Sequence, residues 1–330
     1  MYIKNNSKSV AYAMLFISFL VLGCTGGDTG STALDKGVVI TEFMFDTPAV
    51  YHKEQINLWL VLENQGAKQV AGNTSVFVYG QTVSNSPKHW QVVEDTLSLY
   101  PVSEGMSSEK LDGAWTIPND DFLPPQPEMG VPGGVATFEA TLIAPELEQG
   151  ESTPYTFFTR VCYPYKTSML STLTSSSREE MRIQQDTSAV ENVNTAGPIH
   201  VNLGGQQNIV ARGSSIPVIF RITDVGGGFS TSMATDCEAS PSSMDRNKVD
   251  IKIEVEGVML DGESIIPYGA GGTTPSCGKT VKLINGEAEL RCSVPVDSDE
   301  PTREYHIRAI AEYKYYVGSD AKVTVDYIGE

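Results

Sequence analysis

Apolar and polar residues alternate along most of this chain, which is the pattern of β-strands. The clearest case is residues 56–66, and the chain repeats it 160 positions later at residues 216–226. Each copy places apolar residues at every second position, so they share one face of a strand. Each copy ends in an Asn/Asp-x-Gly turn, where we expect Asn64 or Asp224 to bond its own backbone and the glycine to adopt a positive φ. A period this long indicates two tandem domains of one kind.

Further alternating segments fill both halves of the chain, without a convincing amphipathic helix. The expected strands are 39–45, 55–63, 74–79, 135–143, 154–163, 166–174, 199–203, 216–223, 249–255, 279–284, 287–292, 305–316 and 321–328, the last two separated by a turn at 318–320. Asn285-Gly286 is a strong hairpin signal. We therefore predict an all-β fold of two tandem immunoglobulin-like antiparallel β-sandwiches, over 37–174 and 196–330. Residues 175–195 form the predicted linker, with a short helical segment at 178–185.

Residues 83–132 interrupt the first predicted sandwich with seven prolines and isolated aromatic residues. Loops of this length are often functional. The aromatic residues either contact a partner or hold the insertion against its own sandwich; they are Trp90, Tyr100, Trp115 and Phe122. The loops around Cys237 and at 269–276 are further candidate contact elements.

The N-terminus predicts export. Two lysines precede an apolar run at 10–23, which has the length of a signal peptide and is too short for a comfortable membrane span. The run ends in Val-Leu-Gly-Cys, which resembles the lipobox of secreted lipoproteins, with Cys24 as the lipid-carrying thiol. We predict a signal peptide over 1–23 and a lipidated Cys24 with a flexible tether over 24–36. The alternative is a plain signal peptide or an uncleaved anchor, in which Cys24 has no role.

The charge balance argues against nucleic acid as a partner. The formal net charge is −18; without Lys4 and Lys8 of the predicted signal peptide, 21 basic residues face 41 acidic ones, a net charge of −20. No basic stripe is present to neutralise phosphates. An N-glycosylation sequon begins at Asn73, and we treat its occupancy as open.

Four cysteines besides Cys24 favour disulfides in an exported chain. The Asn285-Gly286 turn places Cys277 near Cys292, so we expect that pair to bond. Cys162 and Cys237 then pair by exclusion, unless Cys162 stays free.

No motif indicates catalysis or a bound cofactor. The histidines lie in four separate segments, and the chain has no Gly-x-Ser-x-Gly elbow, phosphate loop or Cys-x-x-Cys spacing. We expect a protein that is not an enzyme and has no cofactor. The acidic loops at Asp120-Asp121 and at Asp297, Asp299 and Glu300 are weak calcium candidates, and simple solvated loops explain them as well.

Several short segments resemble a known group of proteins. They are Cys-Tyr-Pro-Tyr-Lys-Thr at 162–167, Gly-Pro-Ile-His-Val at 197–201, Asp-Val-Gly-Gly-Gly at 224–228 and Leu-Glu-Asn-Gln-Gly at 62–66. Together they resemble surface proteins of archaea with small genomes, which carry tandem immunoglobulin-like, cell-adhesion-related domains on an N-terminal lipid or membrane anchor. Such proteins often have a second cysteine soon after the Tyr-Lys-Thr segment, and residues 168–177 here have none.

The sequence therefore favours a non-enzymatic lipoprotein on the extracellular face of the cell membrane. It would act in adhesion or envelope scaffolding, with an envelope protein or a glycan as partner. One alternative is a substrate-binding or accessory lipoprotein of a transporter or envelope enzyme. Another is a secreted carbohydrate-binding or hydrolase accessory protein, in which the aromatic residues of the insertion would bind sugar.

Overall fold

The computed structural model describes most of the chain after the predicted tether. The described residues are 35–70, 72–93, 98–100, 114–117, 122–184, 189–205, 207–210, 215–256, 258–259, 277, 279–296 and 302–329. They belong to one compact unit, Ala33–Glu330. Within this described part, no helix is both long and apolar enough to cross a membrane.

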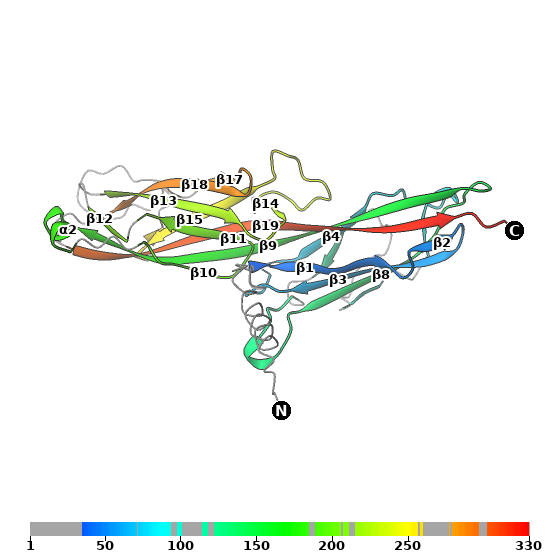
Figure 1. The fold of residues 1–330 in the computed structure, drawn as a ribbon, viewed down its shortest axis with the longest axis horizontal. Coiled ribbons are helices and arrows are strands. Elements are labelled where there is room, and N and C mark those ends of the chain that lie inside the picture. Colours follow the sequence, from blue (N-terminus) through cyan, green and yellow to red (C-terminus); the bar gives the residue numbers. More distant parts are fainter. Residues whose placement is uncertain are drawn as a thin grey trace, which may run out of the picture. The chain divides into compact units, whose positions relative to one another are not determined.

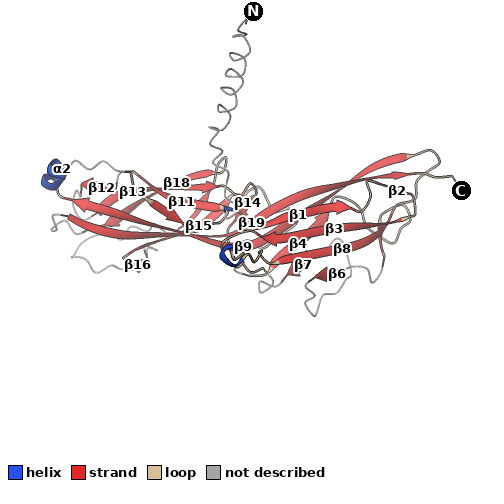
Figure 2. Ribbon diagram, turned by 60° about the horizontal axis from the view of Figure 1, so that its bottom comes forward, coloured by secondary structure: helices blue, strands red, loops and turns tan. Residues whose placement is uncertain are grey.

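Nearly all regular structure is β-strand, arranged in three sheets (Figure 2). The first small sheet contains β1 (Val38–Phe45), β3 (Gln55–Asn64), β8 (Val135–Ile143), β5 (Gln91–Val92) and β6 (Ser98–Tyr100). The second small sheet contains β11 (Ile199–Gly204), β13 (Ser215–Asp224) and β18 (Glu287–Pro295). The small sheets repeat one pattern, because β1-β3-β8 and β11-β13-β18 are each antiparallel in that order.

A large third sheet serves both halves of the molecule. Its main path is β16 (Val258–Met259), β15 (Lys248–Val255), β19 (Thr302–Asp326), β9 (Ser152–Ser176), β4 (Thr74–Tyr79) and β7 (Ala114–Ile117). Shorter strands join it: β2 (Ala49–Tyr51), β10 (Asn192–Asn194), β12 (Asn208–Val210), β14 (Phe229–Thr231) and β17 (Lys279–Lys282). Each small sheet packs on part of this sheet, which confirms the predicted pair of immunoglobulin-like β-sandwiches. Helix α2 (Arg178–Gln184) forms where a short helical segment was expected.

The strands β9 and β19 hold the third sheet together. Each is 25 residues long, and they pair antiparallel without a break, from Thr302 opposite Ser176 to Asp326 opposite Ser152 (Figure 1). At about 3.3 Å per residue, this ladder extends over roughly 80 Å. The predicted breaks near residue 164 and at 318–320 are therefore wrong. Gly318, which we interpreted as a turn residue, lies within the ladder, where an added Cβ would approach the Thr159 carbonyl oxygen to 3.1 Å.

Each long strand runs through both halves, so that its C-terminal end lies in the half built mainly from the other repeat. In the first half, Phe45 of β1 packs against Phe157 of β9, and β2 pairs with the C-terminal end of β19. In the second half, β15 pairs with the N-terminal part of β19, and β12 pairs with the C-terminal end of β9. Each half therefore contains strand segments from both repeats. The boundaries 37–174 and 196–330 stay a prediction, and the halves they define share one sheet.

Two tyrosines of the shared sheet hold the repeated turns. Gly66 N–H donates to Asn64 Oδ1 at 3.0 Å, and an added Cβ on Gly66 would lie 2.5 Å from Tyr165 Oη. In the second copy, Gly226 N–H donates to Asp224 Oδ1 at 3.1 Å, and an added Cβ would lie 2.5 Å from Tyr315 Oη.

The expected bonding of Asn64 and Asp224 to their own backbone is thus confirmed, while the reason for the glycines differs from the prediction. Neither Gly66 nor Gly226 has a positive φ. Glycine is needed there because the tyrosine hydroxyl occupies the space of a side chain.

The turn at Asp224 predicts a pH-dependent stability. Burial raises the pKa of Asp224, against the lowering effect of hydrogen bonds from Tyr315, Gly226 and Gly227. A neutral side chain therefore suits the folded site better, and the stability that it contributes at low pH is lost as the pH rises through the raised pKa.

We expect Asp224→Asn, which keeps the acceptor oxygen without charge, to raise the free energy of unfolding at about pH 7. The variant should match the wild type at about pH 3, where the aspartate itself is protonated. Urea unfolding at both pH values measures this. Asn64 already performs this role in the first half. A variant that is less stable than wild type near neutral pH would contradict the inference.

Candidate interaction surfaces

Two of the four aromatic residues predicted to contact a partner are core residues. Trp90 is 1% exposed and packs edge-on against Tyr155 and Phe157, with ring centroids 5.4 and 5.3 Å away. Phe122 is fully buried, and its carbonyl oxygen accepts a hydrogen bond from Asn64 Nδ2 at 2.9 Å. The partner-contact prediction is wrong for these two, because they hold the insertion against its own sandwich. Tyr100 and Trp115 lie in β6 and β7, and their side chains lie outside the described part.

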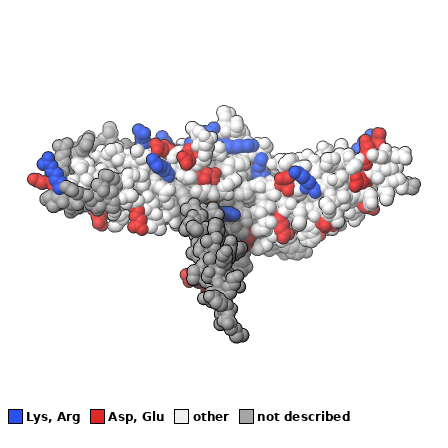
Figure 3. All heavy atoms as spheres, viewed as in Figure 1, with Lys and Arg blue, Asp and Glu red and all other residues white. Residues whose placement is uncertain are grey.

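Several other predicted residues also lie outside the described part: Cys24, Asp120, Asp121, residues 269–276, Asp297, Asp299 and Glu300. The sequon residue Asn73 is described and exposed. Within the described ranges, no group of three or more His, Cys, Asp or Glu side chains is placed to hold a metal ion. On the face seen in Figure 3, acidic and basic side chains are interspersed.

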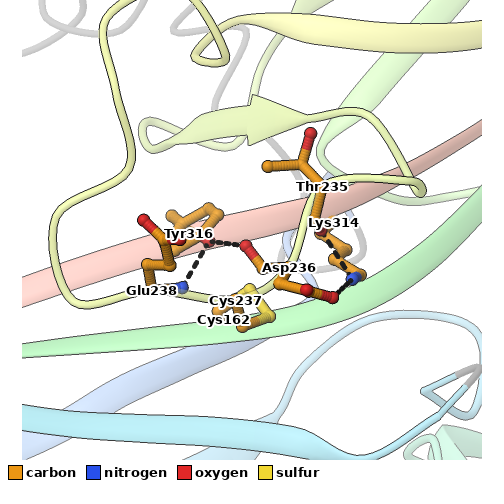
Figure 4. Close-up of a disulfide and its surroundings, with 7 residues drawn as sticks. All are labelled: Cys162, Thr235, Asp236, Cys237, Glu238, Lys314 and Tyr316. Carbon is orange, nitrogen blue, oxygen red and sulfur yellow. Dashed lines mark hydrogen bonds and ion pairs between the residues drawn. A yellow bond between two sulfur atoms is a disulfide. The ribbon is translucent and has the colours of Figure 1, made fainter.

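A disulfide attaches the loop at residues 232–247 to the outer face of the shared sheet. Cys162 of β9 bonds Cys237, with the Cα atoms 5.9 Å apart (Figure 4). Beside it, Glu238 N–H donates to Tyr316 Oη at 3.2 Å, and Lys314 Nζ donates to the Thr235 carbonyl oxygen at 2.6 Å. The loop is thus held by one covalent bond and by two residues of β19.

An aromatic and arginine cluster supports the same loop. Phe229 stacks on Tyr316, with centroids 4.6 Å apart and planes 6° apart. The guanidinium groups of Arg160 and Arg246 lie 5.7 and 5.0 Å from the Phe229 ring centroid. Arg160 also donates to the Ala239 carbonyl oxygen. Cation–π contacts of this kind stabilise a partly buried site by roughly 0.5–2 kcal/mol each. The loop therefore presents a fixed surface, from which the Met244 side chain stands 74% exposed.

The observed disulfide is the pairing that we expected by exclusion. The pairing that we favoured, Cys277 with Cys292, is not formed in the structure, where both are free and buried. Their thiols are hydrogen-bonded to each other. A second disulfide at this place stays a prediction.

An apolar turn at residues 122–135 projects from the first half (Figure 1, where its short helical coil lies below β1, β3 and β8). The exposed fractions of its large apolar side chains are 52% for Leu123, 70% for Met129, 47% for Val131 and 46% for Val135. Glu128 is the only charged residue in this range. The sequence signal for this segment is four prolines and a single acid among apolar residues, and the exposure of those residues appears only in the structure.

The second half closes the equivalent connection differently. There, residues 283–286 join β17 to β18 through the Asn285-Gly286 turn, whereas residues 118–134 join β7 to β8 in the first half. The equivalence follows from the backbone, because Asn64 N–H donates to the Gly134 carbonyl at 2.9 Å and Asp224 N–H to the Gly286 carbonyl at 2.8 Å. A tight turn is therefore sufficient to make this connection in the second half. The apolar turn of the first half is an insertion that the fold does not need.

No protein-family model matches the chain, and no curated relative matches it. Among solved structures, a red sea bream transglutaminase aligns at 7% identity over 88% of this chain and 31% of its own, with a TM-score of 0.16. The type II cohesin dyad of the ScaA scaffoldin from Acetivibrio cellulolyticus aligns at 10% identity over 85% of each chain, with a TM-score of 0.20. The CupB6 tip adhesin from Pseudomonas aeruginosa aligns at 9% identity over 89% of this chain and 99% of its own, with a TM-score of 0.19.

The chain thus spans 31% of the transglutaminase. TM-scores this low carry no argument about fold or activity. The fold rests on the strand pairing, and the function rests on the residues described above.

The disulfide makes a stability prediction. Removing it with Cys162→Ala and Cys237→Ala should lower the free energy of unfolding by roughly 2–4 kcal/mol, because the unfolded chain regains the freedom of a long loop. Trypsin should also cut faster at Arg246, since the loop loses its covalent attachment.

Urea unfolding with and without reductant provides the control. The reductant should destabilise the wild type to the level of the double variant. If the reductant also lowers the free energy of unfolding of the double variant, a Cys277–Cys292 disulfide must be present. Equal stability of reduced and oxidised wild type would contradict a role for the disulfide in holding the loop.

Proposed function

We propose that this chain is an exported, non-enzymatic protein held at the outer face of the cell membrane by a lipid on Cys24. Its two β-sandwiches serve adhesion or envelope scaffolding. The observation that carries the proposal is the unbroken β9–β19 ladder. Because both halves contain strand segments from both repeats, the two sandwiches move as one body. A protein that must hold a partner at a fixed position outside the cell needs such a body.

Export is supported by the disulfide as well as by the N-terminus. Disulfides persist in oxidising compartments and are rare in reducing ones. The disulfide joins buried Cys162 to partly buried Cys237 and fixes the loop on the outer face of the sheet. The high net negative charge also suits a surface that must stay soluble and must not associate with itself.

The partner is best sought at the loop 232–247, because it is fixed and exposed. A rigid loop loses little conformational freedom on binding, so more of its contact energy becomes affinity. Met244 offers an exposed apolar contact. Arg246 beside it offers a cation, and the described part shows no ion pair with it. We propose an envelope protein or an envelope glycan as the partner.

Photo-crosslinking on intact cells tests this function. A photoreactive amino acid replaces Met244 in the full chain, and crosslinked products are identified by mass spectrometry. We expect products with an envelope protein or an envelope glycan. The same chain with Cys24→Ser is the control, which should leave the membrane fraction and lose these products. Products with a permease would favour a role in transport, and a crosslinked small molecule that the free protein converts in solution would contradict the non-enzymatic proposal.

A further inference from the structure

We propose that the apolar turn at residues 122–135 is a second membrane contact, which inserts its exposed side chains into the lipid surface that carries the chain's anchor. This inference rests on the proposed lipid anchor at Cys24 and adds a contact made by the folded protein itself. The occupant is the headgroup and upper acyl region of the bilayer.

The exposure of the turn is unusual for a soluble surface. Leu123, Met129, Val131 and Val135 are all at least 46% exposed within one short segment. Exposed large apolar side chains gathered in one short segment mark a candidate interaction site. Glu128 carries the only charged side chain in the segment, so a single charged group must stay at the headgroup level when the turn enters the lipid surface.

The turn is rigid, so its apolar side chains cannot fold back onto the protein. Gln126 and Val131 bond each other in both directions, at 2.9 and 3.1 Å, and Gly134 N–H donates to the Leu123 carbonyl oxygen at 2.9 Å. Buried Phe122 anchors one end of the segment. The prolines restrict the rest of the backbone. A preorganised apolar tip loses little entropy when it enters another phase.

The turn lies beside the point where the tether joins the folded body. Gln65 N–H donates to the Gly37 carbonyl oxygen at 3.0 Å, and the neighbouring Asn64 N–H donates to the Gly134 carbonyl oxygen at 2.9 Å. The chain between Cys24 and Gly37 has 13 residue steps, so its greatest reach is roughly 45 Å. A lipid on Cys24 therefore keeps the bilayer within reach of the turn at all times.

The distribution of charge makes the apolar turn a better lipid contact than the rest of the protein surface. The body is strongly acidic, so anionic headgroups repel it. The turn is an apolar element with a single acid, and its large apolar side chains are exposed. Exposed apolar side chains of this kind suit insertion into a deformable lipid surface.

An environment-sensitive dye at the turn tests the proposal directly. Residues 25–330 carry a histidine tag in place of Cys24 and are bound to phosphatidylcholine vesicles through a nickel-chelating lipid. The dye is attached through Met129→Cys, since Cys277 and Cys292 are buried. We expect a blue shift of the emission on vesicles and loss of at least half of its intensity with quencher-labelled lipid.

Ile284→Cys is the matched control. Its side chain is 73% exposed, against 70% for Met129, and it lies at the turn that closes the equivalent connection of the second half. We expect no shift there. Adding Val131→Asp to the Met129 variant should abolish the shift, because a carboxylate does not enter the acyl region.

Two outcomes would overturn the proposal. If neither dye shifts its emission on vesicles, the turn stays in water. A blue shift of the Met129 dye without vesicles means that protein covers it, either this chain or a second copy. Because the tag supplies the anchor, neither outcome depends on whether Cys24 carries a lipid in the cell, which the crosslinking control reports separately.

Discussion

The antiparallel pairing of β9 with β19 is the constraint on which the rest of this structure depends. Every residue from Ser152 to Ser176 has a partner in β19, so the ladder cannot be divided between two independent domains. The core follows from it, because odd-numbered side chains of both strands face inward along the whole length. These include Phe157, Tyr165, Leu173, Ile307, Tyr315 and Val323, all under 5% exposed. Two small sheets then cover this one continuous surface.

The middle of the ladder is the crossing point of the two repeats. Tyr163 lies opposite Tyr315 and Tyr165 opposite Tyr313, and all four side chains are buried. Two of the hydroxyl groups reach the repeated turns: Tyr165 Oη accepts from Lys68 N–H at 3.2 Å, and Tyr315 Oη donates to Asp224 at 2.6 Å and accepts from Gly228 N–H at 2.7 Å. Burial raises the pKa of Tyr165 to about 12, so it stays a neutral donor. The glycines of both turns are fixed by this packing.

Local strand patterns could be predicted from the sequence because they depend only on side-chain alternation. Residues 135–143 and 74–79 form strands as expected, and Asn285-Gly286 forms the expected tight turn with a positive φ at both residues. The strands that this turn joins do not pair as a hairpin, because β17 pairs with β15 and β18 with β13 in different sheets. The continuity of the long strands could not be predicted, since Pro164 and Gly318 are ordinary break signals. At Pro164 the edge of β9 away from β19 lies between the residues paired with β4 and those paired with β10, so its missing N–H breaks no described pairing there. The burial of Trp90 likewise depends on distant Phe157. In the sequence, the apolar turn is visible only as part of a proline-rich insertion, because exposure is a tertiary property.

The shared ladder is tested most directly by destabilising one half and observing the other. All three tryptophans, Trp59, Trp90 and Trp115, lie in the first half of the sequence, so their fluorescence reports on that half. Phe220→Ala removes a fully buried side chain of β13 in the second half and should cost roughly 3–5 kcal/mol. Ile222→Val is the milder variant if that protein does not fold. The account predicts that the urea midpoint of tryptophan fluorescence falls together with that of far-ultraviolet circular dichroism. An unchanged tryptophan midpoint beside a lowered dichroism midpoint would show two independent domains and contradict it.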